Sequence, residues 1–268
     1  IMSERIKKIF ETKGKKLVTF TTGGDPDLNT SLEILKTIIN NGIDIIEIGM
    51  PFSDPMADGP TIQESSVRSL VNGTKINDIF EIVMNIRKFN NEIPIILMGY
   101  YNSIFNLGIE NFTSKCAETG VDGLIIVDLQ PEEDSELYSK TKEKNIDLIR
   151  LITPTTDQKR LNTILNNASG FLYYVTVTGI TGQNSANIED LKKSINTIKS
   201  STKLPIIAGF GIKSREDVEQ ISTFADGVVV GSSIVNIIKD NLNDKNKMIN
   251  EIKIFTKNLK EGVSEWTG

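Results

Sequence analysis

The feature that most constrains the fold of this chain is a regular alternation of short apolar runs with longer amphipathic segments. The apolar runs are rich in Ile, Leu and Val and have the length of β-strands; they span residues 17–22, 44–49, 94–98, 123–128, 147–152, 171–175, 205–208 and 227–230. Strands that are apolar throughout are typical of parallel sheets, because helices cover both faces of such a sheet. The pattern therefore predicts parallel strands connected by helices.

A segment with apolar side chains at helical spacing follows each run. The predicted helices span residues 28–40, 61–70, 76–89, 112–118, 132–144, 158–166, 188–199 and 215–221, with two more beginning at residues 232 and 248. Eight strand–helix units in about 250 residues favour an α/β fold of the (β/α)8, or TIM, barrel type. We expect one barrel domain over residues 1–268, with short extra helices. A doubly wound open sheet is the alternative, but it would normally have fewer strands and a glycine fingerprint near its start.

Charge and composition narrow the class of protein. The 268 residues have a formal net charge of −5, and lysines alternate with acids along the predicted helices, so we expect no nucleic-acid partner. The single cysteine, Cys116, cannot form an internal disulfide and is best explained as a small buried hydrophobe. No apolar run approaches the roughly 18 residues of a membrane span, and the start of the sequence lacks the apolar core of a signal peptide. We therefore expect a soluble cytoplasmic protein without a membrane partner.

The chain contains no histidine. This excludes Ser-His-Asp and Cys-His triads and removes the commonest ligand of transition metals. Acid–base chemistry would have to come from carboxylates, Lys, Tyr or Cys116.

Carboxylates concentrate at the end of the second predicted strand and in the proline-rich loop after it. Glu47 lies within the apolar run, and Asp54 and Asp58 follow in the loop. Burying an unpaired carboxylate costs several kcal/mol, so Glu47 needs either a partner or a function. A Lys or Arg partner for Glu47, a capping role for Asp54 and a turn role for Asp58 are the structural alternatives.

Two glycine-rich loops follow the last two predicted strands, at residues 209–214 and 231–233. Glycines let backbone N–H groups approach an anion, and barrels commonly hold a phosphate at these two loops. Residues 179–182 could add a third edge to the site. The alternative is that each loop is only a tight turn.

Three aromatic residues, Phe20, Tyr173 and Phe210, fall at the ends of predicted strands on the same face of the barrel. Filling of the core would explain any one of them. Three aromatic side chains around a phosphate site suggest a flat apolar substrate.

Residues 47–63, EIGMPFSDPMADGPTIQ, resemble the signature of the tryptophan synthase alpha subunit family. The motifs GDP (24–26), VTGITG (177–182), GFGI (209–212) and GS (231–232) occur in the order of that family. The resemblance implies a carbon–carbon lyase that cleaves indole-3-glycerol phosphate to indole and glyceraldehyde 3-phosphate. It also implies an α2β2 complex with a beta subunit that carries pyridoxal phosphate, and no metal or cofactor in this chain.

The resemblance also assigns roles to residues at matching positions. Glu47 would transfer protons at indole C3 and at the side-chain hydroxyl, and Asp58 would bind the indole N–H and stabilise the cationic ring. Thr181 would bond Asp58 when the loops close. The indole pocket would consist of Phe20, Met98, Ile125, Tyr173 and Phe210. The phosphate would bind at Gly182, Gly211, Gly231 and Ser232.

The chain departs from the family at Gln130, where many relatives carry a proline near the partner interface, and at Met98, where leucine is common. Asp128 matches an acid of the family whose role could be structural.

Three other functions remain compatible with parts of the pattern. A phosphate site alone would also fit an isomerase or prenyltransferase barrel. A lyase that releases free indole without a partner would keep the same residues. A silent subunit that only binds the ligand and regulates a partner is disfavoured by the presence of both Glu47 and Asp58.

Overall fold

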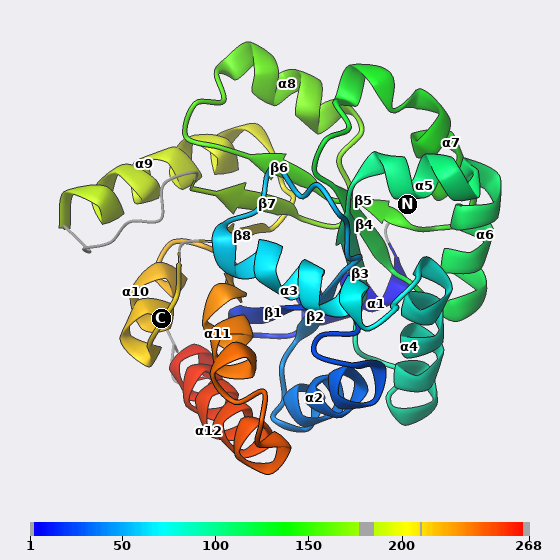
Figure 1. Ribbon diagram of the computed structural model, residues 1–268. Helices are drawn as coiled ribbons and strands as arrows, with labels where there is room; N and C mark the ends of the chain where they lie inside the picture. Colours follow the sequence, from blue (N-terminus) through cyan, green and yellow to red (C-terminus); the bar gives the residue numbers. More distant parts are fainter. Residues whose placement is uncertain (1–2, 177–184, 210, 265–268) are drawn as a thin grey trace.

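The computed structural model describes residues 3–176, 185–209 and 211–264. In these ranges one sheet of nine parallel strands forms the centre of the molecule, and helices surround it (Figure 1). The strands are β1 Lys16–Thr22, β2 Ile45–Gly49, β3 Ile95–Gly99, β4 Gly123–Ile126, β5 Asp147–Leu148, β6 Arg150–Ile152, β7 Leu172–Val175, β8 Ile206–Gly209 and β9 Gly227–Val230.

The sheet closes into a barrel through its two end strands. The strand order is β5-β4-β3-β2-β1-β9-β8-β7-β6, and only Ile149 separates β5 from β6 in the chain. The Ile149 N–H donates to the Leu124 carbonyl at 3.0 Å, which continues the pairing of β5 with β4, whereas β6 pairs with β7. The predicted fifth strand is therefore divided in two. The prediction of a (β/α)8 barrel is confirmed, and the doubly wound sheet is excluded.

The helices cover the outside of the barrel. They are α1 Glu4–Glu11, α2 Leu28–Asn40, α3 Pro60–Val71, α4 Ile76–Phe89, α5 Tyr101–Leu107, α6 Ile109–Thr119, the 3-10 turn η1 Pro131–Glu133, α7 Ser135–Glu143, α8 Gln158–Asn166, α9 Ser185–Ser201, α10 Arg215–Ser222, α11 Ser232–Asp240 and α12 Lys245–Ser264. The helix predicted over 132–144 is interrupted at Asp134, whose buried carboxylate forms an ion pair with Arg150. Short extra helices were expected, and α5 and η1 are such elements.

The core has two parts, one inside the barrel and one between the barrel and the helices. The inner part is made of alternate strand residues such as Val18, Ile45 and Val229, which share one face of their strands. Helix α1 closes the amino-terminal end of the barrel: Ile6 is fully buried there, and the Phe10 ring lies 5.8 Å from the ring of Phe171. The carboxyl-terminal ends of the strands lie at the opposite end.

Two buried carboxylates fix α1 to the barrel. The Ser3 N–H donates to Asp147 at 2.8 Å, and the Ser3 hydroxyl donates to Asp122 at 2.7 Å. Asp122 also pairs with Arg5 and Arg87. Burial raises the pKa of Asp147 to about 6.

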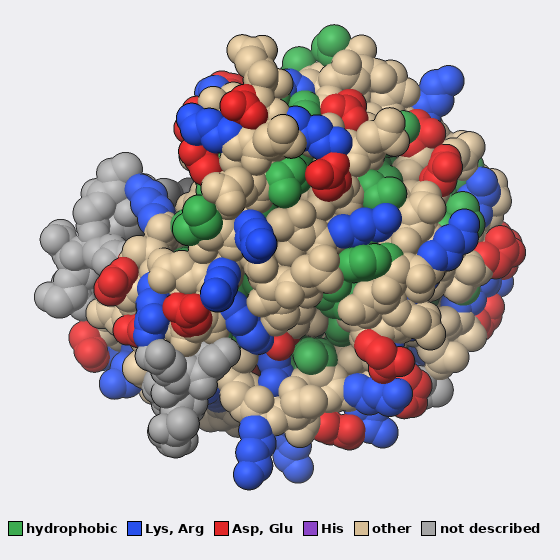
Figure 2. Space-filling view, turned by 90° about the horizontal axis from the view of Figure 1, so that it is seen from below, with side chains coloured by type: hydrophobic (Ala, Val, Ile, Leu, Met, Phe, Trp, Pro, Cys, Tyr) green, Lys and Arg blue, Asp and Glu red, His purple; other side chains and the backbone are tan. Residues whose placement is uncertain are grey.

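The outer surface is mixed in charge. Figure 2 shows basic and acidic side chains interspersed over one face of the molecule. Cys116 is buried in the outer part of the core, as expected, and burial raises the pKa of its thiol. Within the described ranges, no helix is long and apolar enough to cross a membrane.

Candidate active site

Glu47 lies inside the barrel and has no partner among the residues that the structure describes. Strand register places it beside Phe20 on β1 and Ile96 on β3, and only 1% of its surface is exposed. Among the described residues, no side chain or backbone group hydrogen-bonds its carboxyl oxygens, and no Lys or Arg forms an ion pair with it. The alternative of a paired structural glutamate is therefore wrong for this part of the chain.

Burial and a neighbouring acid keep the Glu47 carboxyl protonated. Loss of solvation raises its pKa to about 8, and the negative charge of Asp58 adds to the increase. Near neutral pH the side chain is then a neutral acid that can donate a proton, and its conjugate base can accept one.

Asp58 stands at the end of the loop between β2 and α3. Its N–H donates to the Pro55 carbonyl at 3.0 Å, and the Gln63 side-chain amide donates to its carbonyl at 2.8 Å, so hydrogen bonds fix its backbone. Its carboxyl does not cap α3 and instead lines a cavity. Burial raises the pKa of this carboxyl, and a hydrogen bond with Tyr100 partly offsets the increase. The turn expected here is present, but the carboxyl takes no part in it and faces the cavity.

Tyr100, at the end of β3, holds this loop in place. The Ala57 N–H donates to the Tyr100 hydroxyl at 2.9 Å, and the Phe52 ring stacks on the Tyr100 ring with centroids 5.1 Å apart. Burial, together with the charge of Asp58, raises the Tyr100 pKa to about 12. The sequence prediction missed this residue. A hydroxyl directly after a strand, on the face where loops meet, was the available signal.

Helix α3 is attached to the end of β1 by polar contacts. The hydroxyls of Ser65 and Thr22 lie 2.5 Å apart, and the Ser69 hydroxyl donates to the Gly23 carbonyl at 2.7 Å. Arg68 forms two hydrogen bonds to the buried Asp25, at 2.8 and 2.9 Å. These contacts fix the helix that follows Asp58.

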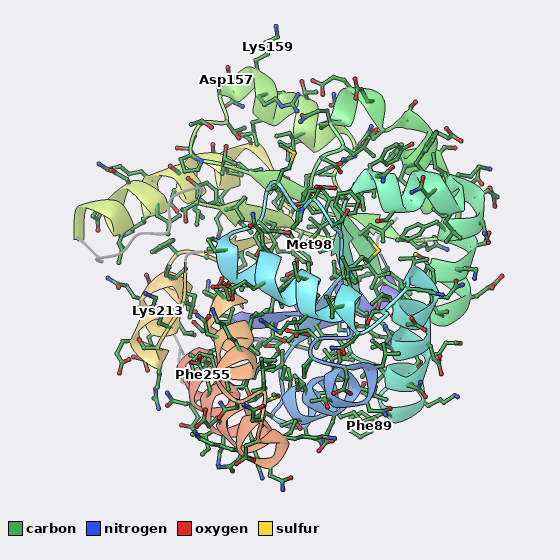
Figure 3. The ribbon with its side chains drawn as sticks, in the orientation of Figure 1. Phe89, Met98, Asp157, Lys159, Lys213 and Phe255 are labelled. Atoms are coloured by element: carbon green, nitrogen blue, oxygen red, sulfur yellow. The ribbon has the colours of Figure 1, made fainter. Side chains whose placement is uncertain are left out.

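A cavity of about 330 Å³ opens at the carboxyl-terminal ends of the strands. This volume is in the usual range for a small-molecule site. One part of its lining is apolar and includes Phe20, Met98 and Tyr173, and Figure 3 shows Met98 near the centre of the molecule. The other part contains Gly211 and Ser232, with their neighbours. The cavity can therefore hold a molecule with a flat apolar end and an anionic end.

Glycines make room for the aromatic walls of the cavity. A Cβ atom at Gly49 would lie 2.6 Å from the Phe20 ring, and one at Gly209 would lie 2.9 Å from the Tyr173 ring. Both distances are shorter than side-chain packing permits, so these glycines set the positions of the two rings.

The other end of the cavity is built from backbone. Gly211 has a φ of +63°, a conformation that favours glycine. Helix α11 begins at Ser232, directly after Gly231, and no side chain caps it. The first N–H groups of a helix have no partner within the helix, and the helix dipole favours an anion beside them.

The other residues singled out in the sequence lie away from the cavity or outside the described ranges. Ile125 is buried in the inner core and is not part of the cavity lining. Asp128 accepts a 2.7 Å hydrogen bond from the Tyr101 N–H, which fixes the start of α5, and the side chain of Gln130 accepts one from Arg160. The predicted residues Thr181, Gly182 and Phe210 lie outside the described residues. Asp54 is exposed and accepts a hydrogen bond from the Ser53 hydroxyl at 3.0 Å.

Comparison with known proteins identifies the family. The sequence profile of the family described as "Tryptophan synthase alpha chain" matches residues 6–264. The chain belongs to the tryptophan synthase alpha chain family. A tryptophan synthase alpha chain of Petrotoga mobilis is 44% identical over 256 residues, which cover 96% of this chain and 98% of that one.

Solved structures agree with the family. Tryptophan synthase subunit alpha of Legionella pneumophila superposes with a TM-score of 0.91 at 34% identity, covering 98% of this chain and 99% of that one. A chain in a Mycobacterium tuberculosis tryptophan synthase structure gives 0.89 at 28% identity, with 98% and 99% covered. The family is a lyase family: it cleaves indole-3-glycerol phosphate to indole and glyceraldehyde 3-phosphate in tryptophan biosynthesis, and this is the function of the chain.

Proposed function

We propose that Glu47 and Asp58 are the catalytic residues of this cleavage. The burial of the Glu47 carboxyl without a hydrogen-bond partner among the described residues is the observation that supports the proposal most strongly, and this burial raises its pKa to about 8. Protonated Glu47 donates a proton to indole C3, which leaves a positive charge on the ring. The Asp58 carboxylate accepts the indole N–H and stabilises that charge.

The second half of the reaction returns Glu47 to its starting state. The Glu47 carboxylate accepts the proton of the side-chain hydroxyl, the bond between C3 and the side chain breaks, and its electrons return to the ring. Indole and glyceraldehyde 3-phosphate are the products. Glu47 donates one proton and accepts one proton in each cycle, so this chain requires no metal or cofactor of its own for the cleavage.

We assign the two parts of the cavity to the two parts of the substrate. Phe20, Met98 and Tyr173 would contact the indole, with Ile125 packing behind them in the inner core. The phosphate would bind at Gly211, Gly231 and Ser232, where backbone donors meet the start of α11. By resemblance to the family, the proposal extends to Phe210 in the indole pocket, Gly182 at the phosphate, and Thr181 as the partner of Asp58 on closure.

We further propose that a beta subunit carrying pyridoxal phosphate docks beside the loop that holds Asp58, in an α2β2 complex. Two large apolar side chains are exposed there: Met56 on the loop is 90% exposed and Phe105 on α5 is 67% exposed. Tyr100 contacts the loop and directly precedes α5, so both side chains lie near one end of the barrel. Large apolar side chains exposed at the same end of the barrel are candidates for a protein interface. The proposed setting is a single barrel domain, residues 1–268, in the cytoplasm.

Indole release from indole-3-glycerol phosphate tests the catalytic assignment. We expect Glu47→Gln and Asp58→Asn each to lower turnover by at least about a hundredfold while substrate still binds. Glu118→Gln is the matched control, because it removes an exposed carboxyl on α6. Appreciable turnover by Glu47→Gln would refute the role of Glu47. Repeating the assay with added beta subunit separates a partner-dependent enzyme from one that releases free indole alone.

A further inference from the structure

Lys213 is a cation in the wall of the cavity that the catalytic scheme does not use. It lies in the connection between β8 and α10 (Figure 3). Among the described residues that line the cavity, Lys213 is the positively charged one. Asp58 brings a negative charge to the same lining and interacts electrostatically with Glu47. An anionic substrate in this cavity therefore meets both an acid and Lys213.

Hydrogen bonds hold the backbone of Lys213 beside the start of α11. The Ser233 hydroxyl, in the first turn of α11, donates to the Ile212 carbonyl at 2.7 Å. The Lys213 N–H donates to the Asp217 carboxylate at 2.7 Å. These two hydrogen bonds fix the backbone at Lys213 close to the proposed phosphate site. The side chain of Lys213 is exposed.

The side chain of Lys213 is not occupied by an ion pair within the described ranges. Arg215, two residues further along the chain, is already paired, because it bonds Glu219 at 2.7 Å. Lys213 takes part in none of the ion pairs found among the described residues. Its flexible four-carbon stem allows the ammonium to turn towards an anion in the cavity.

We propose that Lys213 binds the phosphate of the substrate and sets the affinity of this chain for it. The inference rests on the proposed placement of the phosphate at Gly211, Gly231 and Ser232. Backbone N–H groups at a helix start supply only partial charges, whereas a phosphate monoester carries a charge of about −1.5 to −2 near pH 7. Lys213 adds a full positive charge that offsets the repulsion from Asp58.

Removal of the charge should weaken binding of the phosphate and leave binding of indole intact. For Lys213→Met we expect KM for indole-3-glycerol phosphate and Kd for glycerol 3-phosphate to rise by about three- to tenfold at low salt. The difference from the parent should shrink as ionic strength rises, because salt screens an exposed charge. Lys213→Arg should restore most of the affinity. Lys159→Met is the control, since Lys159 lies on α8 at the outer edge of the molecule (Figure 3).

Titration of the full chain with glycerol 3-phosphate and, separately, with indole decides the question. Weaker glycerol 3-phosphate binding with unchanged indole binding supports the proposal. Parent-like glycerol 3-phosphate binding by Lys213→Met, or an equal loss for both ligands, would overturn it. Ser232→Asp, which puts a negative charge at the start of α11, tests the phosphate placement itself: parent-like binding by that variant refutes the placement even if Lys213 matters. A parent that does not bind glycerol 3-phosphate at all overturns both.

Discussion

Replacing Glu47 with glutamine should make the protein more stable at alkaline pH than its parent. A carboxyl whose pKa rises from 4.5 to about 8 on folding favours the folded state only while it is protonated. The rise in pKa corresponds to about 5 kcal/mol in the free energy of unfolding of the parent. The parent loses this stability progressively as the pH rises from about 4.5 to about 8. The glutamine side chain of the variant cannot titrate. Between pH 5 and pH 9 the stability of the variant relative to the parent should therefore increase by about 4 kcal/mol.

Urea unfolding of both proteins at several pH values between 5 and 9 measures this difference. Glu118→Gln serves as the control, because it makes the same chemical change at an exposed position on α6. Parallel curves for Glu47→Gln and the parent would refute the reasoning, since they would mean that Glu47 is solvated or paired in the folded protein.

Contacts elsewhere in the molecule lead to three further predictions. Tyr100→Phe removes the hydroxyl that bonds Ala57 and Asp58, so kcat/KM for indole release should fall by about tenfold, whereas Tyr101→Phe should stay near the parent. As the pH rises from 4 to 7, the free energy of unfolding of Asp147→Asn should increase by up to about 3 kcal/mol relative to that of the parent. The reason is that the raised pKa of Asp147 makes its ionisation unfavourable to folding in the parent. Phe105→Glu should weaken binding of the beta subunit at least tenfold in a titration followed by calorimetry, while the exposed Phe89 on α4 can be changed to Glu without this effect.

Most strands and several helices could be predicted because their patterns are local. The apolar runs are continuous, and α2, α4 and α8 begin and end where their periodicity does. The interruption of the fifth strand at Ile149 could not be predicted. It reflects pairing with β4 on one side and β7 on the other, which no local pattern encodes. Helix α5 was missed because it has only seven residues.

The site was predictable where a residue type conflicts with its surroundings. A carboxylate within the apolar run at Glu47 is such a conflict, and the structure confirms its burial. Whether a cation would pair with it depends on contacts between distant segments, so the sequence left that open. The position of Tyr100 directly after a strand placed its hydroxyl at the correct end of the barrel, but its contact with Ala57 depends on how the loop that carries Asp58 folds over the end of β3.

Exchange of the indole C3 hydrogen in heavy water is the most direct test of Glu47 as the proton donor. Protonation of C3 by Glu47 and its reversal would replace that hydrogen with deuterium, and proton NMR follows the loss of the signal. With glycerol 3-phosphate present, the parent should catalyse exchange and Glu47→Gln should not. Exchange by Glu47→Gln at the rate of the parent would contradict the proposed role of Glu47.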